Sequence, residues 1–127
     1  MFEVAYETTF CATHRLTEGD RFLEPLHGHD WRVEAVASGE SLDRIGVVVD
    51  FEVLKKVVAE VASRFHYKDI NEHPAFRGKS PSAEEVARYF FDEVRTGMDA
   101  EGKRLLRVRI WEAPGCSATY VGPRDGC

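Results

Sequence analysis

The chain opens on a segment in which apolar and polar positions alternate. The side chains at every second position are mostly apolar and end on a histidine: Phe2, Val4, Tyr6, Thr8, Phe10, Ala12 and His14. This alternation is typical of a strand with one face in the core. Residues 15–26 lose the period and contain Gly19 and Pro25, which predicts a loop that is long for a plain hairpin. Alternation resumes from His27 to Ala37 and predicts a second strand paired with the first.

Helical spacing replaces alternation in the middle of the chain. Asp50 is placed to cap a helix over about residues 51–65, whose apolar stripe comprises Leu54, Val57, Val58, Val61, Ala62 and Phe65. After an irregular stretch, Ser82 stands three residues before Glu85, which is the spacing of a capping box. Apolar residues then recur at helical spacing, at Val86, Ala87, Phe90 and Val94. We therefore expect a second helix here.

Alternation returns near the C-terminus. One side of a third predicted strand carries Leu106, Val108, Ile110 and Glu112, so a carboxylate ends its apolar face. Pro114 and Gly115 mark a turn, and residues 116–121 predict a last strand. The order β-β-α-α-β-β predicts an α+β fold, a single domain over residues 1–127 with two helices on one face of an antiparallel sheet.

Composition narrows the class of protein. The 127 residues are 43% hydrophobic and 31% charged, as in an ordinary globular protein with a modest core. A net charge of -5, from 17 basic and 22 acidic residues, argues against a nucleic-acid partner. No apolar run approaches the ~18 to 20 residues of a membrane helix, and no basic signal peptide opens the chain, so we expect a cytoplasmic protein without a membrane partner. Cys11, Cys116 and Cys127 lack paired spacing and indicate neither a thiolate zinc finger nor a disulfide framework.

Three of the five histidines, His14, His27 and His29, are predicted on the apolar faces of two neighbouring strands. The His-x-His pair places two rings on the same side, about 6.6 Å apart along the strand, and the third ring can complete a triangle around one ion. Three neutral imidazoles with an open fourth position is the pattern of catalytic zinc. Hydrogen-bonded core histidines are the alternative, but three converging histidines favour the metal.

Two carboxylates and a dipeptide are further candidates. A buried carboxylate is costly unless it is paired, so Glu112 is either a structural ion-pair partner or a substrate anchor that accepts two N–H donors. Glu24 precedes His27 in the predicted loop and is either a solvated residue or a base beside a metal-bound substrate. Taken alone, His66 is a partner of the helix dipole and Tyr67 is a packing residue.

In their order along the chain, these motifs resemble the 6-pyruvoyl-tetrahydropterin synthase and 6-carboxy-tetrahydropterin synthase family. The resemblance rests on runs spread over nearly the whole chain: Phe10–His14, Leu26–Trp31, Val49–Lys55, Lys68–Asn71, Pro81–Ala87 and Trp111–Tyr120. It implies the tunnelling fold, whose protomers associate edge to edge into a trimeric barrel and usually stack as a hexamer.

The resemblance also implies a site. It places a zinc ion on His14, His27 and His29, and a pterin whose 2-amino and ring N–H edge is held by Glu112. Ser82 and Glu84 belong to the same implied substrate site.

Two catalytic elements of the family are absent from this sequence. The family cysteine stands four residues before the HGH motif, where this chain has Leu23, and the family's Asp-His pair corresponds to His66 and Tyr67. A subgroup instead carries a glutamate three residues before HGH, where Glu24 stands, and resembles a substitute for dihydroneopterin aldolase. Tyr67 does not simply replace an imidazole, because a phenol relays a proton but is a poor base at neutral pH.

These observations lead to three hypotheses. The first is a zinc-dependent lyase acting on the side chain of dihydroneopterin or its triphosphate, with Glu24, His66 and Tyr67 as catalytic candidates. The second is aldolase-like formation of 6-hydroxymethyl-dihydropterin that uses Glu24. The third is a catalytically degenerate protein that binds zinc and a pterin or purine. In each case we expect a homo-oligomer, a hexamer built as a dimer of trimers.

Overall fold

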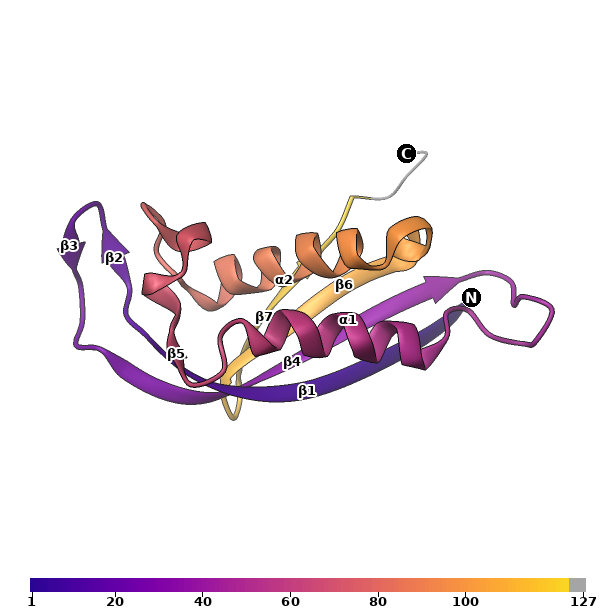
Figure 1. The fold of residues 1–127 in the computed structure, drawn as a ribbon, viewed down its shortest axis with the longest axis horizontal. Helices are drawn as coiled ribbons and strands as arrows, with labels where there is room; N and C mark the ends of the chain where they lie inside the picture. The colour runs from indigo at the N-terminus through magenta and orange to yellow at the C-terminus, as the bar shows by residue number, and fades with distance from the viewer. Residues whose placement is uncertain (124–127) are drawn as a thin grey trace.

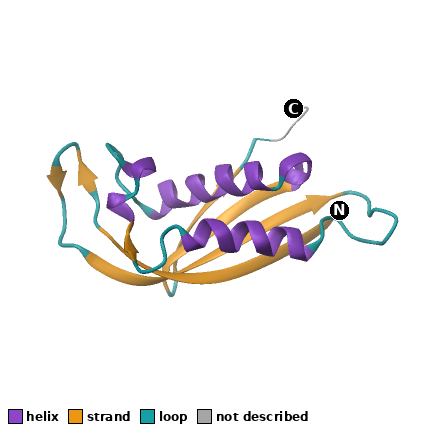
Figure 2. Cartoon of the chain, in the orientation of Figure 1, coloured by secondary structure: helices purple, strands orange, loops and turns teal. Residues whose placement is uncertain are grey.

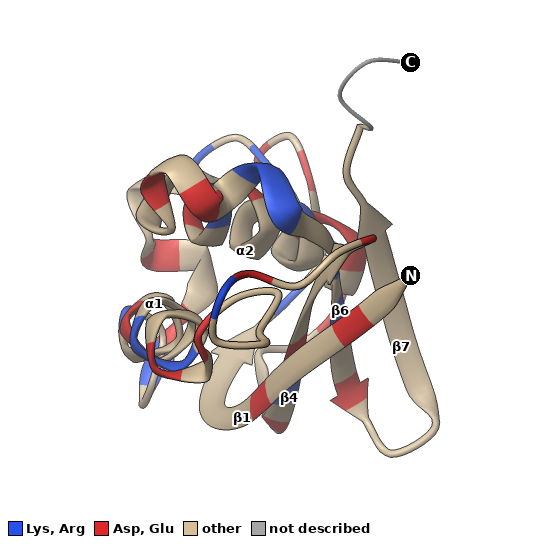
Figure 3. Ribbon diagram, turned by 90° about the vertical axis from the view of Figure 1, so that its right-hand side faces the viewer, with Lys and Arg blue, Asp and Glu red and all other residues tan. Residues whose placement is uncertain are grey.

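The structure is a computed structural model that describes residues 1–123, so Cys127 lies outside it. Its centre is a five-stranded sheet in the order β5-β1-β4-β6-β7. The long strands are β1 (Phe2–His14), β4 (His27–Gly39), β6 (Leu105–Ala113) and β7 (Cys116–Val121). Helices α1 (Phe51–Ser63) and α2 (Ala83–Gly97) lie over one face of this sheet (Figure 1). The view turned by 90° shows both helices on the same side (Figure 3), which confirms the predicted fold class.

Strands β1 and β4 pair antiparallel over their whole length, from Phe2 opposite Gly39 to His14 opposite His27. Because successive side chains point to opposite faces, the register turns one set of positions toward the helices. The fully or nearly fully buried members of this set are Phe10, Ala12 and His14 in β1 and Trp31, Val33, Ala35 and Ala37 in β4.

The core lies between this face and the apolar stripes of the helices. Phe10 is near its centre, with its ring centroid 6.0 Å from that of Trp31 and 5.5 Å from that of Phe90. The Trp31 indole N–H donates to the carbonyl of Ala12 at 3.1 Å, so its buried polar atom is satisfied. The same indole meets the ring of His14 edge-on at 4.8 Å, so the core directly supports the site described below.

Short elements fill both stretches expected to be irregular (Figure 2). Residues 15–26 contain a small hairpin, β2 (Thr17–Glu18) and β3 (Arg21–Phe22). Between the helices lie β5 (Lys68–Asp69) and two 3-10 turns, and a third 3-10 turn precedes β6: η1 (Ile70–Glu72), η2 (Pro74–Phe76) and η3 (Asp99–Arg104). Since β5 pairs parallel with β1, the sheet is mixed and the purely antiparallel expectation was wrong at this edge. No helix within residues 1–123 has the length and apolar character needed to cross a membrane.

A bulge in β6 changes which leucine points to the core, so the prediction for Leu106 was wrong. Ala37 pairs with Leu105 and Val36 pairs with Arg107, so Leu106 is an extra residue on its strand. Leu105 is buried as a result, whereas alternation placed Leu106 on the apolar side. Beyond the bulge, Val108 and Ile110 face the core as expected.

Candidate active site

Three histidine rings lie together where β1 ends and β4 begins. His14 is directly opposite His27, and His29 lies two residues further along β4. The ring centroids are 4.6 Å apart for His14 and His27, 5.4 Å for His14 and His29, and 4.8 Å for His27 and His29. The structure thus brings the three histidines together on one face, and their role as metal ligands stays a prediction.

Backbone carbonyl groups orient two of these rings. The Nδ1 atom of His14 lies 2.8 Å from the carbonyl oxygen of Pro81, and that of His27 lies 2.9 Å from the carbonyl oxygen of Pro25. A carbonyl oxygen only accepts hydrogen bonds, so in a neutral ring Nδ1 carries the hydrogen and Nε2 keeps its lone pair. This is how metal-binding histidines are commonly held by a second layer of groups.

Glu112 completes a group of four. One ligand atom from each of His14, His27, His29 and Glu112 can be chosen so that all four lie within 4.8 Å of one another. The Glu112 Oε1 atom is 2.7 Å from His14 Nε2 and 3.6 Å from His29 Nε2. Neither Nε2 atom has a hydrogen-bond partner of acceptable geometry among the described residues, although both are buried. Convergent lone pairs without partners fit a bound cation.

Burial also keeps the site suited to a metal. Desolvation lowers the pKa of His29, against an opposing effect of the Glu112 charge. A lowered pKa favours the neutral imidazole, which is the form that binds metal. His14 is fully buried beside it.

A pocket of about 560 Å³ opens beside Glu112, at the β6–β7 hairpin and the start of α2. Glu84 lines this pocket with Glu112. Ser82 is the N-cap of α2, and its hydroxyl accepts the N–H of Glu85 at 3.2 Å. The substrate-binding roles predicted for Glu112, Ser82 and Glu84 stay predictions.

Glu24 lies next to the histidines but outside the group of four. Its Oε2 atom is 3.6 Å from the Nδ1 atom of His27 and is buried without a hydrogen-bond partner. A partly buried carboxylate with a free oxygen beside a candidate metal centre is placed to exchange a proton with a bound substrate.

The structure does not bring His66 and Tyr67 into the group of four. Both follow the end of α1 and are held against β1, where Tyr67 N–H donates to the Cys11 carbonyl at 2.6 Å and Cys11 N–H donates to His66 Nδ1 at 3.1 Å. Tyr67 has φ of 60° and is 81% exposed, so it is not a packing residue. A bulky residue in this left-handed conformation is unusual and points to a constraint on its position.

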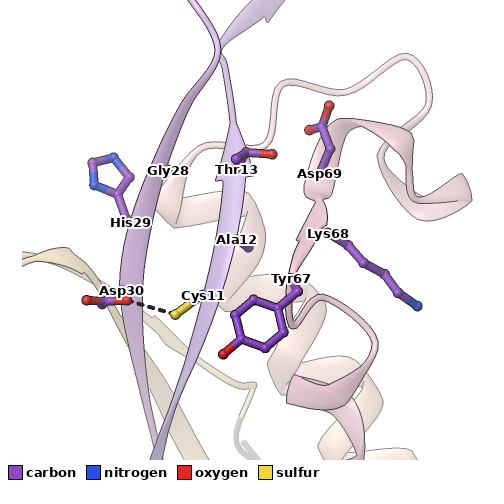
Figure 4. Close-up of a pocket in the computed structure, with 9 residues that line it drawn as sticks. All are labelled: Cys11, Ala12, Thr13, Gly28, His29, Asp30, Tyr67, Lys68 and Asp69. Atoms are coloured by element: carbon purple, nitrogen blue, oxygen red, sulfur yellow. Dashed lines mark hydrogen bonds between the residues drawn. The ribbon is translucent and has the colours of Figure 1, made fainter.

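Sequence reasoning missed a second pocket, of about 490 Å³, in which Tyr67 lies beside Cys11 (Figure 4). Cys11 and Asp30 are direct partners in the β1–β4 register, and the thiol donates to the carboxylate at 2.8 Å. This hydrogen bond is the main reason that the pKa of Cys11 is raised. A raised pKa keeps the thiol protonated and poorly nucleophilic. Strand parity and the β1–β4 register together place the Cys11 and Asp30 side chains opposite each other.

Comparison with known proteins identifies the family. The sequence profile of the 6-pyruvoyl tetrahydropterin synthase family matches residues 3–123, and the chain belongs to this family. The chain is 30% identical to the dihydroneopterin monophosphate aldolase of Pyrococcus furiosus, over 86% of this chain and 88% of the relative. It is 31% identical to the 6-carboxy-5,6,7,8-tetrahydropterin synthase of Bacillus subtilis, over 98% of this chain and 88% of the relative.

Solved structures agree on the fold. The 6-pyruvoyl tetrahydropterin synthase of Caenorhabditis elegans superimposes with a TM-score of 0.86 at 24% identity, and 96% of each chain is covered. The Plasmodium vivax synthase, solved with a catalytic glutamate replaced by alanine, gives a TM-score of 0.70 at 18% identity, covering 94% of this chain and 96% of that chain.

Proposed function

We propose that this chain is a zinc-dependent lyase of pterin metabolism that acts on the side chain of a dihydroneopterin-type substrate. The observation that carries this proposal is the group of His14, His27, His29 and Glu112, whose ligand atoms lie within 4.8 Å of one another beside a pocket. Zinc bound there supplies Lewis-acid chemistry at the side-chain oxygens of the substrate. Glu112 accepts N–H donors of the pterin ring, Glu84 lines the same pocket, and Ser82 caps the helix that begins beside it.

We propose the aldolase type of reaction, with Glu24 as the base. Of the described cysteines, Cys11 pairs with Asp30 and Cys116 is exposed in the pocket beside Glu112, whereas Glu24 has a free buried oxygen next to His27. The base removes the proton of the hydroxyl on the second side-chain carbon, and the bond to the first carbon breaks. The electron pair moves into the pterin ring, and the first carbon then takes up a proton. The products are 6-hydroxymethyl-dihydropterin and a two-carbon aldehyde.

The relatives support two readings of the product. The Pyrococcus relative is an aldolase on dihydroneopterin monophosphate, and the Bacillus relative is a 6-carboxy-tetrahydropterin synthase. A catalytic glutamate in the Plasmodium vivax protein supports a carboxylate in place of the cysteine. His66 and Tyr67 act in this proposal from a second copy in an oligomer, because their own chain holds them outside the group of four.

The test follows the products formed by the zinc-loaded protein. Dihydroneopterin and its mono- and triphosphate are incubated with the protein, and the pterins are separated and detected by fluorescence after oxidation. We expect 6-hydroxymethylpterin, with the rate lowered at least about 100-fold by Glu24→Gln and the zinc content unchanged.

Glu18→Gln is the matched control, since Glu18 is an exposed carboxylate in the same loop region, and it should keep the wild-type rate. Binding of pterin without turnover of any substrate would contradict catalysis and favour the degenerate binding protein. A 6-carboxylated product would favour the synthase reaction.

A further inference from the structure

The Glu112 carboxylate lies between the three histidines and the neighbouring pocket. Glu112 lies 2.7 Å from His14 Nε2 and 3.6 Å from His29 Nε2, and the same side chain lines the 560 Å³ pocket. Two N–H donors of a pterin edge need both carboxylate oxygens. One oxygen is already engaged by the histidines, so Glu112 cannot serve both partners fully at the same time.

The contact between Glu112 and His14 joins two acceptors. The Pro81 carbonyl, 2.8 Å away, fixes the hydrogen of a neutral His14 on Nδ1 and leaves a lone pair on Nε2. The carboxylate oxygen also offers only lone pairs. Two such atoms at 2.7 Å repel unless they share a proton or a metal cation. The Nε2 atoms of His14 and His29 are buried and neither has a hydrogen-bond partner of acceptable geometry among the described residues, which favours a metal cation at this position.

We propose that Glu112 is a fourth ligand of the metal in the substrate-free protein and that it leaves the metal when a pterin ring enters the pocket. The inference rests on the proposed function for its metal and its ring. Four protein ligands make a closed site, whereas three leave the open position that catalysis uses. Glu112 therefore keeps the metal four-coordinate until a pterin ring binds. The carboxylate then accepts two N–H donors of the ring and no longer binds the cation.

The exchange has a thermodynamic consequence. If the metal and the ring compete for Glu112, each weakens the binding of the other by the same factor. This competition is measured most directly with a pterin that has no side chain, because such a pterin offers the metal no hydroxyl to replace the Glu112 carboxylate. A substrate with side-chain hydroxyls can bind the metal at the coordination position that Glu112 leaves, and this binding masks the loss of affinity.

The experiment measures binding, not turnover. The affinity for a pterin without a side chain is measured by fluorescence on the zinc-loaded and the metal-free protein, and we expect zinc to weaken it about 5- to 150-fold. The affinity for zinc is measured by competition with a chelator, and Glu112→Gln is expected to lower it at least about tenfold. Glu18→Gln is the control, since Glu18 is an exposed carboxylate outside both the pocket and the group of four, and its zinc affinity should equal that of the wild type.

A third measurement needs no variant. The visible absorption of the cobalt-loaded protein should be that of a four-coordinate ion, and it should change when the plain pterin saturates the site. An unchanged spectrum at saturation, or a Glu112→Gln protein with wild-type zinc affinity, would overturn the inference and leave the proposed function standing. Failure of both forms to bind any pterin would overturn the proposed function instead, and the zinc affinity of Glu112→Gln would still decide whether Glu112 is a ligand.

Discussion

At the scale of single residues, the histidines divide by what their Nδ1 atoms contact. His14 and His27 face carbonyl oxygens, so their Nε2 atoms are free for a cation. His66 and His73 face backbone N–H groups, so their Nδ1 atoms are acceptors and their Nε2 atoms carry the hydrogen. The backbone thus contacts the first two rings through carbonyl oxygens, whereas the other two rings accept backbone N–H groups and hold loops in place.

His73 makes stability depend on pH. Burial, with Arg64 and Lys68 nearby and against the opposing charge of Glu93, lowers the pKa of His73 below its ordinary value of 6.5. The unfolded chain therefore binds the proton more readily, and the contribution of neutral His73 is present above pH 6.5 and is lost as the pH falls through the lowered value. Protonation also removes the Nδ1 acceptor that caps the N–H of Ala75.

We expect His73→Asn to flatten this dependence, because asparagine keeps a capping acceptor but does not titrate. Urea unfolding between pH 7.5 and 5.5 measures it. The slope of the unfolding free energy with pH should be shallower in the variant, by at most about 1.4 kcal/mol per pH unit, the limit for one proton. Equal slopes in the two proteins would contradict the role of His73.

Alternation along two neighbouring strands predicted the face that the three histidines share, because strand side chains have a strict period of two. The position of Tyr67 was not predictable in this way. Its φ of 60° is held by hydrogen bonds to Cys11, which is distant in the sequence. Tyrosine has no local preference for that conformation, so the sequence carries no signal for it.

At the scale of elements, the start of α2 is joined to the candidate metal centre. Pro81 offers its carbonyl to His14, and the next residue, Ser82, caps the helix. The helix that covers the sheet therefore also fixes the orientation of a buried ring.

Removing the Ser82 cap should destabilise the start of α2. Ser82→Ala leaves the N–H of Glu85 without its acceptor and is expected to lower the free energy of unfolding by about 1 kcal/mol. Ser82→Asn restores a capping acceptor and should recover most of the loss. Urea unfolding of the three proteins decides the matter, and an alanine variant as stable as the wild type would show that the cap contributes nothing.

Long elements were predictable from the sequence and short ones were not. Repeated apolar spacing located β1, β4, α1 and α2, since each repeats its period several times. The two-residue strands β2, β3 and β5 carry no period: β2 and β3 exist as a local hairpin, and β5 exists only through its pairing with the distant β1. The bulge at Leu106 was not predictable for a related reason. One inserted residue reverses which side chains at the strand end point to the core, and it leaves the composition of the strand unchanged.

At the scale of the whole molecule, the sheet leaves β7 as an edge. In the described residues no strand lies beyond it. Gly122 N–H donates to the Leu106 carbonyl at 3.0 Å, which fixes the alternation of the β6–β7 ladder. By that alternation Thr119, opposite Arg109, directs its N–H and C=O away from β6. Long open edges invite pairing with another chain, so we expect copies to associate edge to edge into closed rings.

A proline at Thr119 tests this association. It removes one outward N–H but no hydrogen bond to β6, so Thr119→Pro should break the ring and leave the protomer folded. Light scattering should give a multiple of 14.4 kDa for the wild type and for the Thr119→Ala control, and about 14.4 kDa for the proline variant. A wild-type protein of 14.4 kDa, or a proline variant with the wild-type mass, would contradict edge pairing through β7. His66 and Tyr67 lie outside their own chain's group of four, so loss of turnover together with the ring is the outcome expected if they act in the site of a neighbouring copy.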